Sequence, residues 1–339
     1  MHIIATIGPR SNNKMVIKEL IENGVDILRL NCSHFDKEFF EKTINYSKAL
    51  KKDIHILVDL CGKKIRISKE FKYIYTVYNG QEVYFCGEDY YKKLSISKLK
   101  EKTIIPLNID SKKIIKSNIQ SISMKDNTMK FEIMDIKDGI IKTKVLNGGV
   151  IREGKGCNIS KIYNDENELN KNDEENIVWA LKNNVDIICQ SFVESKNDIR
   201  IIKDLIDKNN KKCEVWAKVE TPVGIKNLKE IIEEVDTIVI GRGDLVPESG
   251  ILDSINLQNE AIRIIKKNNK KVIIATHLLN SMKNGNLATL PELESIYNFI
   301  NINVDGFLLA GETSIGRAPI KTVDFLKTAI DYYMEYKNE

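Results

Sequence analysis

A carboxylate and three cations lie close together in the stretch LVDLCGKKIRIS, residues 57–68. Asp59 ends an apolar run, and Lys63, Lys64 and Arg66 follow it within seven residues. A solvated loop carries such charges without any function, whereas a site that handles phosphate needs cations beside a buried carboxylate. The stretch alone is compatible with both interpretations.

Polar residues also gather at the ends of seven apolar, strand-like runs. A single residue of this kind is explained by capping of the next helix or by contact with solvent. The agreement of six or more runs favours a shared site instead. The residues are Arg29, Asn31, Ser33 and His34; Asp59; Gln190 and Ser191; Lys218 and Glu220; Arg242, Gly243 and Asp244; Thr276 and His277; Glu312 and Thr313.

The chemistry that this set favours is phosphoryl transfer with a divalent metal. Lys218 and Glu220 are two residues apart on a strand, so their side chains share a face. Glu220 and Asp244 are carboxylates without His or Cys beside them, which suits Mg²⁺ or Mn²⁺. A lysine and arginines near such a metal suit a phosphoryl group in transfer. The chain has no GxxxxGK[ST] motif, so a nucleotide is held in another way.

These side chains need a scaffold that brings the strand ends together. Apolar runs alternate with amphipathic segments such as 13–24, 196–209 and 252–269, a pattern typical of parallel βα units. Eight runs predict an α/β fold with a closed TIM (β/α)8 barrel, whose active site lies at the carboxyl ends of the strands. The runs are residues 2–8, 26–33, 54–60, 185–192, 215–220, 237–244, 272–277 and 304–312.

A long gap after the third run predicts an inserted domain. It contains short β-type runs separated by NG, KDG and NGG turns. We therefore expect a barrel formed by residues 1–69 and 166–339, with a small all-β domain, 70–165, inserted after strand 3. The β-type runs are residues 73–78, 82–87, 103–108, 129–136 and 139–146.

Charge and composition narrow the partners. The 52 basic and 48 acidic residues give a net charge of +4, too small to indicate nucleic acid or a membrane surface as a partner. No apolar run reaches the roughly 18–20 residues that span a bilayer. The six cysteines contain no CxxC pair, and the N-terminus lacks the pattern of a signal peptide. These features predict reduced thiols and a cytoplasmic location.

The chain resembles the pyruvate kinase family in motifs that occur in the family's order along nearly its whole length. The motifs are ATIGPRS, RLNCSH, VDLCGKKIR, NGGVIREGKGCNI, SFVESKNDI, AKVETPVGIKN, GRGDL, ATHLLNSM and AGETSIGRAP. The resemblance implies a barrel with a mobile B domain after strand 3, in agreement with the gap. It also implies an Mg²⁺-dependent glycolytic kinase that transfers phosphoryl from phosphoenolpyruvate to ADP, giving pyruvate and ATP.

The resemblance also implies roles for individual residues. Lys218 matches the lysine that stabilises the phosphoryl group in transfer, and Glu220 and Asp244 match the divalent-metal ligands. Arg29 and Arg66 match arginines that contact phosphates. The remaining expectations are nucleotide contacts at Arg29, Asn31, His34, Arg66 and Lys155; substrate contacts at Gly243, Asp244 and Thr276; and a monovalent-cation site at Asn31, Ser33 and Asp59.

Lys64 indicates independence of K⁺. In the family this position is glutamate in K⁺-dependent members and lysine in K⁺-independent ones, and Leu60 and Ile67 also agree with the second group. A lysine ammonium carries the same charge as K⁺ and is tethered to the chain. At about 4 Å from an anion, with an effective dielectric near 20, it contributes roughly 4 kcal/mol before desolvation. We therefore expect no K⁺ requirement.

Several departures from the family pattern keep two alternatives open. Phe35, Gly241, His277, Leu290 and Ala310 replace the family's usual residues. The small Gly241 and Ala310 are compatible with a wider substrate pocket, but drift in a divergent, working enzyme is the favoured interpretation. The alternatives are a kinase of this type acting on another enol or hydroxy acid in a specialised pathway, and an inactive regulator that binds phosphoenolpyruvate or nucleotide. The family's C-terminal regulatory domain is expected to be absent, and with it any response to sugar bisphosphates. The barrel allows a homo-oligomer.

Overall fold

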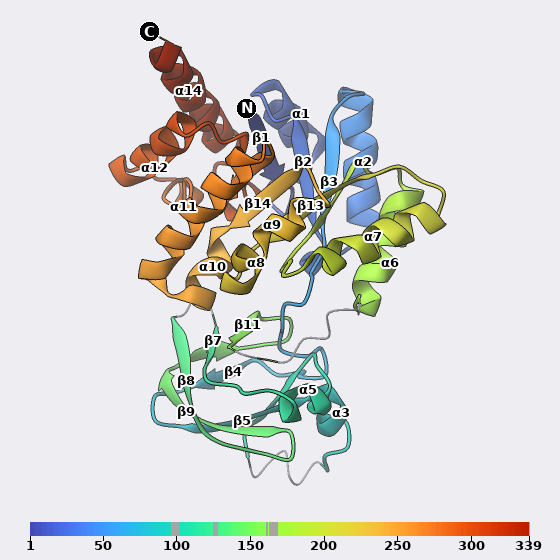
Figure 1. Ribbon diagram of the computed structural model, residues 1–339, viewed down its shortest axis with the longest axis vertical. Coiled ribbons are helices and arrows are strands. Elements are labelled where there is room, and N and C mark those ends of the chain that lie inside the picture. Colours follow the sequence, from blue (N-terminus) through green and yellow to red (C-terminus); the bar gives the residue numbers. More distant parts are fainter. Residues whose placement is uncertain (96–101, 125–127, 161, 163–168, 339) are drawn as a thin grey trace. The chain divides into compact units, whose positions relative to one another are not determined.

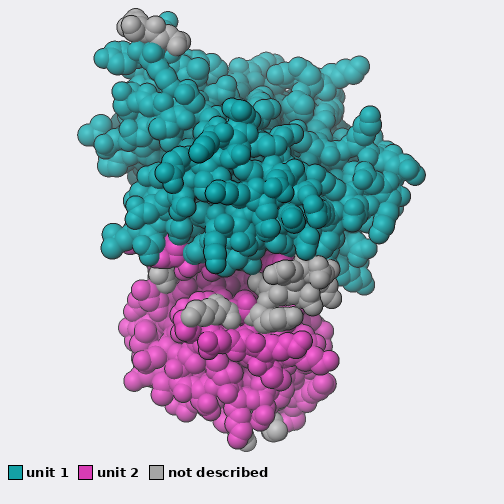
Figure 2. Space-filling view, in the orientation of Figure 1, with its two compact units in different colours: residues 1–62, 167–245, 252–339 teal, residues 63–166, 246–251 magenta. Residues whose placement is uncertain are grey.

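The computed structural model describes residues 1–95, 102–124, 128–160, 162 and 169–338 (Figure 1). The chain divides into two compact units, which we describe separately (Figure 2). The first comprises residues 1–62, 167–245 and 252–339, and the second comprises residues 63–166 and 246–251.

Eight parallel strands in the described part of the first unit close into a barrel, which confirms the predicted TIM-type fold. Each predicted apolar run supplies one strand, and β16 pairs with β1 to complete the closure. The strands are β1 (His2–Thr6), β2 (Ile27–Asn31), β3 (His55–Asp59), β12 (Ile187–Gln190), β13 (Glu214–Val219), β14 (Thr237–Gly241), β15 (Lys271–Ala275) and β16 (Gly306–Leu309).

Strand residues alternate between two hydrophobic clusters, as the period of two requires. One cluster fills the barrel interior and includes Leu57, Trp216 and Val239. The larger cluster joins the outer faces of the strands to the helices and includes Leu28 and Ile188. The strands therefore read as continuous apolar runs because both of their faces are buried.

Helices surround the barrel and begin at capping residues. Asn13 caps the first helix, Asp36 caps the second, and Ser195 and Asp198 form a capping box. The helices of this unit are α1 (Lys14–Glu22), η1 (Cys32–His34), α2 (Lys37–Leu50), α6 (Lys171–Lys182), α7 (Lys196–Lys208), α8 (Pro222–Lys226), α9 (Leu228–Ile231), α10 (Arg242–Ser249, which continues into the second unit), α11 (Ile251–Lys267), η2 (Met282–Asn284), α12 (Leu290–Asn301), α13 (Gly311–Ser314) and α14 (Pro319–Asn338). Among the described residues, none of the helices is both long and apolar enough to cross a membrane.

The second unit is rich in strands. In its described residues a six-stranded sheet has the order β11-β7-β8-β9-β5-β6, and β10 pairs with β4. Its core includes Val83, Phe85 and Phe131. The strands are β4 (Tyr75–Val77), β5 (Glu82–Gly87), β6 (Ile104–Leu107), β7 (Ile122–Met124), β8 (Met129–Lys137), β9 (Ile140–Asn147), β10 (Gly149–Ile151) and β11 (Cys157–Ile159).

The expectation of an all-β insertion is not confirmed, because this unit also contains the short helices α3 (Glu88–Tyr91) and α5 (Ser111–Ile115). Asp110 caps α5, and the Asp89 carboxylate accepts from the backbone and hydroxyl of Ser111. These local bonds favour helical turns between strands. The expected border at residues 69 and 70 stays a prediction, and the expected border at 165 and 166 lies outside the described residues.

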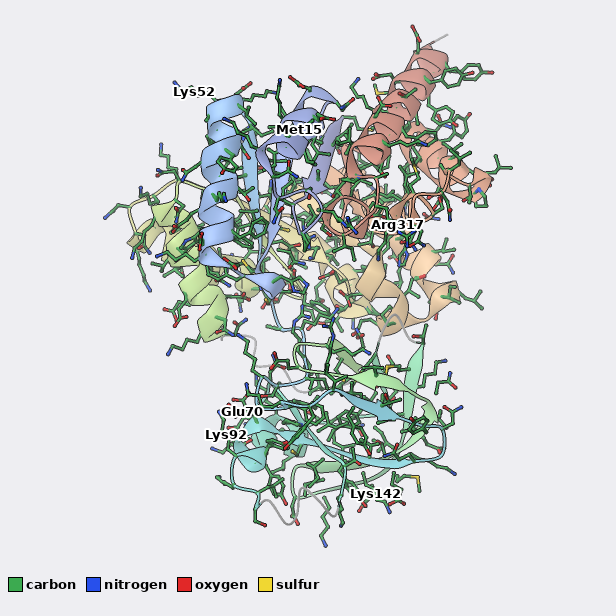
Figure 3. The ribbon with its side chains drawn as sticks, turned by 180° about the vertical axis from the view of Figure 1, so that it is seen from behind. Met15, Lys52, Glu70, Lys92, Lys142 and Arg317 are labelled. Atoms are coloured by element: carbon green, nitrogen blue, oxygen red, sulfur yellow. The ribbon has the colours of Figure 1, made fainter. Side chains whose placement is uncertain are left out.

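Lys92 and Lys142 of the second unit, both labelled in Figure 3, lie in surface ion pairs. Lys92 pairs with Glu88 at 2.6 Å and with Glu70 at 3.6 Å, and Lys142 pairs with Glu82 at 2.9 Å. Exposed pairs of this kind contribute little to stability. These two lysines lie at a solvated surface, the alternative first considered for residues 57–68.

Candidate active site

The carboxyl ends of the barrel strands bring together the residues expected for phosphoryl transfer. Asp59 is the last residue of β3, Arg29 lies in β2, and Glu220 directly follows β13, which contains Lys218. The register places Asn31 opposite Asp59. Strand pairing therefore assembles at one end of the barrel residues that are far apart in the sequence.

Asp59 is the centre of this cluster. Its Oδ2 lies 2.6 Å from Arg29 Nη2 and 2.8 Å from Lys218 Nζ, and it accepts from Arg29 Nε at 2.7 Å. Its Oδ1 accepts from Lys218 at 3.0 Å and from the Ser191 hydroxyl at 2.8 Å. The residue is 1% exposed. Both oxygens of this buried carboxylate are thus contacted by side chains, namely two cations and a hydroxyl donor. Asp59 therefore does not act as a helix cap.

The charges of the cluster are maintained by mutual interaction. Burial alone raises the pKa of Asp59, but Lys218 and Arg29 outweigh it and lower that pKa to about 2. Burial opposes the charge of Lys218, whereas Asp59 and Glu220 together raise the pKa of its ammonium. Asp59 and Lys218 are therefore both ionised at neutral pH.

Arg29 is fixed from a second side. Its Nη1 donates to the Thr6 hydroxyl at 2.8 Å, and that hydroxyl donates to the Leu309 carbonyl at 2.8 Å. Arg29 is 7% exposed. A planar guanidinium held in this way loses little conformational freedom when an anion binds. Sequence reasoning named Ser191 only as a polar residue at a strand end, and it did not select Thr6, since a lone hydroxyl carries no pattern.

Glu220 is buried beside this cluster. Its Oε2 accepts from the backbone N–H of Phe192 at 3.2 Å, and its Oε1 lies 3.8 Å from Lys218 Nζ. Phe192 has φ 56°, a left-handed conformation that is uncommon for a bulky residue. Such strain is often found at functional sites.

Thr276 and Gly243 form a second group at the same end of the barrel. The Thr276 hydroxyl accepts from Gly243 N at 2.8 Å and donates to the Ala275 carbonyl at 2.6 Å. Thr276 and His277 have φ 67° and φ 52°, so two successive side-chain-bearing residues are left-handed. A β-branched residue in this conformation is a genuine outlier, which supports a specific role for Thr276.

Arg242, which the sequence placed among the polar strand-end residues without a specific role, holds this strained turn. Its Nη2 donates to the carbonyls of Thr276 and His277 at 2.6 and 2.7 Å. Burial lowers the pKa of its guanidinium to about 10, against the opposing effect of Glu312, so the group remains charged at neutral pH. Both carbonyls at this strained turn thus accept from one charged donor.

The loop after β3 is anchored by Asp173, which sequence reasoning also missed. The buried Asp173 carboxylate accepts from Cys61 N at 3.0 Å, from Gly62 N at 2.7 Å and from Asn170 Nδ2 at 2.7 Å. Burial raises the pKa of Asp173 despite these bonds. Asn31 Oδ1 accepts from Ser33 N at 3.0 Å, and the Ser33 hydroxyl lies 3.6 Å from Cys61 Sγ. These contacts fix the backbone next to Asp59.

The other expected cations belong to the second unit and are described only within it. Lys64 lies against Gly156, where an added Cβ would be 2.7 Å from Lys64 Cε. Arg66 Nη1 donates to the Gly154 carbonyl at 3.2 Å. Lys155 donates to the Val150 carbonyl and lies 3.2 Å from Met129 Sδ. The segment before β11, which contains Gly154, Lys155 and Gly156, is thus contacted by Lys64 and Arg66.

The donor set suits a hard divalent cation better than zinc. Glu220 offers a buried carboxylate, and Asp244 lies in the first turn of α10. Burial raises the pKa of the Cys189 thiol well above its ordinary value, so this neighbour of Asp59 is not a thiolate ligand. The described residues contain no group of three or more His, Cys, Asp or Glu arranged for a metal. Mg²⁺ fits two carboxylates, since it is usually completed by water and substrate oxygens.

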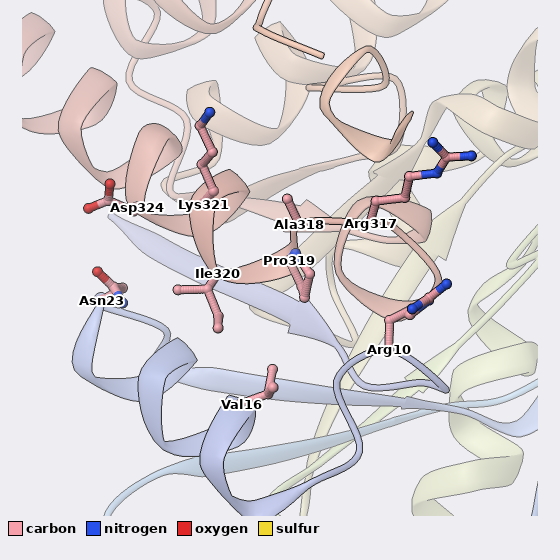
Figure 4. Close-up of a pocket in the computed structure, with 9 residues that line it drawn as sticks. All are labelled: Arg10, Val16, Asn23, Arg317, Ala318, Pro319, Ile320, Lys321 and Asp324. Carbon is pink, nitrogen blue, oxygen red and sulfur yellow. The ribbon is translucent and has the colours of Figure 1, made fainter. Parts of the chain in front are cut away.

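A large cavity is lined by residues of α1 and α14 and of the loops beside them (Figure 4). It has a volume of about 710 Å³, and Val16 and Ile320 line it together with Arg10, Arg317 and Lys321. None of the strand-end residues discussed above contributes to its wall. We therefore assign it no part in the chemistry of the site.

Comparison with known proteins agrees with this geometry. The model of the pyruvate kinase barrel domain matches residues 1–323. The pyruvate kinase of Thermococcus litoralis is 30% identical over 339 residues, covering 99% of this chain and 70% of the relative. That of Methanocaldococcus jannaschii is 32% identical over 338 residues, covering 98% and 70%. Pyruvate kinase 1 of Saccharomyces cerevisiae is 29% identical over 330 residues, covering 95% and 65%.

Proposed function

The chain belongs to the pyruvate kinase family, and we propose that it transfers the phosphoryl group of phosphoenolpyruvate to ADP. It is a pyruvate kinase-type phosphotransferase. In the proposed reaction the bond between phosphorus and the enol oxygen breaks, and a bond to the terminal phosphate oxygen of ADP forms. The released enolate takes up a proton at its methylene carbon and becomes pyruvate. The observation that carries the proposal is the buried contact of Lys218 and Arg29 with Asp59.

Lys218 and Arg29 are the proposed phosphoryl-binding groups. Both are charged, nearly buried and already oriented by Asp59, so they need little rearrangement to meet an anion. Preorganised charges in a site that excludes water stabilise developing charge more strongly than charges in solvent do. Lys218 is therefore the group that we assign to the transferred phosphoryl group.

Glu220 and Asp244 are the residues that would hold Mg²⁺ or Mn²⁺. When bound, the metal neutralises charge on the phosphate oxygens. Glu220 lies 3.8 Å from Lys218, so a lysine and a carboxylate are available on one strand, as the sequence spacing predicted. Thr276 and Gly243, which hydrogen-bond to each other, are proposed to contact the carboxylate and enol end of the substrate.

Independence of K⁺ is supported by the surroundings of Asp59. Both of its oxygens are engaged by Lys218, Arg29 and Ser191. The charge of this expected cation ligand is thus balanced by cations of the chain itself. We propose that Lys64 is the tethered cation that takes the place of K⁺.

The remaining sequence expectations are part of the proposal. Nucleotide contacts are assigned to Arg29, Asn31, His34, Arg66 and Lys155, and the second unit is assigned the part of a lid that excludes water. The small-molecule substrates are phosphoenolpyruvate and ADP. A cytoplasmic location and a homo-oligomer formed through the barrel remain predictions.

The alternative of a different enol or hydroxy acid receives no support from the pocket. A wider pocket at Gly241 was one interpretation of the sequence, but the space above this glycine is taken by Glu220, whose Oε1 lies 2.4 Å from the position of an added Cβ. Ala310 packs against the apolar cluster of the barrel interior. The test of the proposal is direct: the protein with Mg²⁺, phosphoenolpyruvate and ADP should form pyruvate and ATP, and no turnover would contradict it.

A further inference from the structure

Glu220 and Gly241 are neighbours on adjacent strands of the barrel. Lys218 of β13 pairs with Val239 of β14, so the residues two positions further along, Glu220 and Gly241, face each other. Val239 packs in the barrel interior, and the alternation of side chains places residue 241 on the same face. A side chain at residue 241 would therefore point at Glu220.

The carboxylate of Glu220 fills the place of that side chain. A Cβ built on Gly241 would lie 2.4 Å from Glu220 Oε1, 2.6 Å from Cγ and 2.8 Å from Cδ. These distances are far below the roughly 3.5–4.0 Å of ordinary carbon contacts. The φ of Gly241 lies outside the left-handed region, so the backbone accepts alanine. The three nearest atoms that alanine would meet all belong to Glu220.

In this position Glu220 interacts with positive groups of the chain. The Phe192 N–H donates to Oε2 at 3.2 Å, and the Lys218 ammonium lies 3.8 Å from Oε1. Both oxygens of Glu220 are thus directed at groups of the chain itself. An oxygen that already accepts from an N–H has one lone pair fewer to offer a cation. This position therefore suits a carboxylate without metal.

We propose that Gly241 provides a retracted position for Glu220, which the carboxylate must leave to bind the divalent metal. The inference rests on the proposed function, because it takes Glu220 as a ligand of that metal. When Glu220 leaves the retracted position it loses the hydrogen bond from Phe192. This loss makes the net free energy of metal binding less favourable. Gly241 is thus a positioning residue that weakens metal binding in the absence of substrate.

The test is a titration of the full chain with Mn²⁺, without substrates, followed by the electron paramagnetic resonance of the free ion. Gly241→Ala removes the retracted position and should tighten Mn²⁺ binding by up to about tenfold, the equivalent of one hydrogen bond. The matched control is Ile240→Val, which removes one methyl group from the outer face of the same strand. It should bind Mn²⁺ like the wild-type protein.

Each other outcome has a distinct meaning. If the wild-type protein binds Mn²⁺ and Gly241→Ala binds it equally or more weakly, this inference is wrong and the proposed function is untouched. If neither protein binds Mn²⁺, the inference and the metal site both fail. Should Gly241→Ala not fold, wild-type crystals grown with and without Mn²⁺ decide. Glu220 should move away from Gly241 when Mn²⁺ is present, and a carboxylate that stays in place would overturn the inference.

Discussion

The ammonium of Lys218 touches both carboxylate oxygens of Asp59, at 2.8 and 3.0 Å, across 159 residues of sequence. Arg29 shares the same carboxylate. The two cations that we assign to phosphate are therefore held by an internal anion in this structure. A bound phosphate has to compete with Asp59 for them, and the following predictions depend on this relationship.

Lys218→Met should lower the rate of phosphoryl transfer by about 10²–10³, the usual effect of removing a group that stabilises developing charge. The fold should persist, since Asp59 keeps Arg29 and Ser191 as partners. The measurement is turnover beside thermal unfolding. Lys48→Met is the control, because Lys48 also pairs with an aspartate, Asp186, at 2.9 Å. Turnover of the Lys218 variant near the wild-type value would remove Lys218 from the mechanism.

Asp59→Asn should destabilise the protein by about 3–5 kcal/mol, the cost of leaving buried charges without their partner. Lys218 and Arg29 would both lose their shared carboxylate. Urea unfolding measures this change in the free energy of unfolding. Asp186→Asn serves as the comparison. Because Asp186 is partly exposed, this variant should show a smaller decrease in the free energy of unfolding. If the free energy of unfolding decreases no more in Asp59→Asn than in Asp186→Asn, the cluster contributes little to folding.

Stability should fall in acid partly because of Asp59. Its pKa is about 2 in the folded protein and about 3.9 in an unfolded chain, so the folded state favours the ionised form. This contribution is complete above pH 4 and is lost as the pH falls toward 2. It amounts to roughly 2–3 kcal/mol. Unfolding free energies measured at a series of pH values should fall less steeply below pH 4 in Asp59→Asn than in the wild type. Equal slopes would contradict the assigned pKa.

The kinase should be fully active without K⁺ or Na⁺ if, as we propose, Lys64 replaces the ion and the charge of Asp59 is already balanced by Lys218 and Arg29. Activity measured in tetramethylammonium salts at constant ionic strength should not rise when K⁺ is added. Lys64→Glu should lower activity and create partial activation by K⁺. Lys63→Glu is the control, since Lys63 is not assigned to the site. Strong activation of the wild-type enzyme by K⁺ would show that Lys64 does not replace the ion.

The barrel could be predicted from the sequence because its signals are local. Strands buried on both faces appear in the sequence as apolar runs, and helices such as α7 start at capping boxes. The hydrophobic pattern and the capping residues therefore predict the same boundaries for the elements. Lys218 and Glu220 were placed on one face by their spacing alone. The helices α3 and α5 were missed because four or five residues are too few to show a helical period.

The connections within the site could not be predicted in the same way. The expectation that Asp59 is a ligand of a monovalent cation stays a prediction. The sequence did not show that the pairing of β3 with β12 and of β12 with β13 brings Asp59 to Lys218. Asp173 and Arg242 act on backbone groups of loops, a function that leaves no sequence pattern. A wider pocket at Gly241 stayed open as an alternative, because a sequence does not show which neighbour fills the volume that a glycine leaves.

The most direct test of the account is a ³¹P nuclear magnetic resonance time course of the protein with Mg²⁺, phosphoenolpyruvate and ADP in K⁺-free buffer. We predict that the phosphoenolpyruvate signal is replaced by the γ-phosphate signal of ATP, with pyruvate formed in equal amount, and that Lys218→Met leaves the spectrum almost unchanged over the same time. Phosphoenolpyruvate that persists with the wild-type protein, while Mn²⁺ still binds to it, would contradict the proposed reaction.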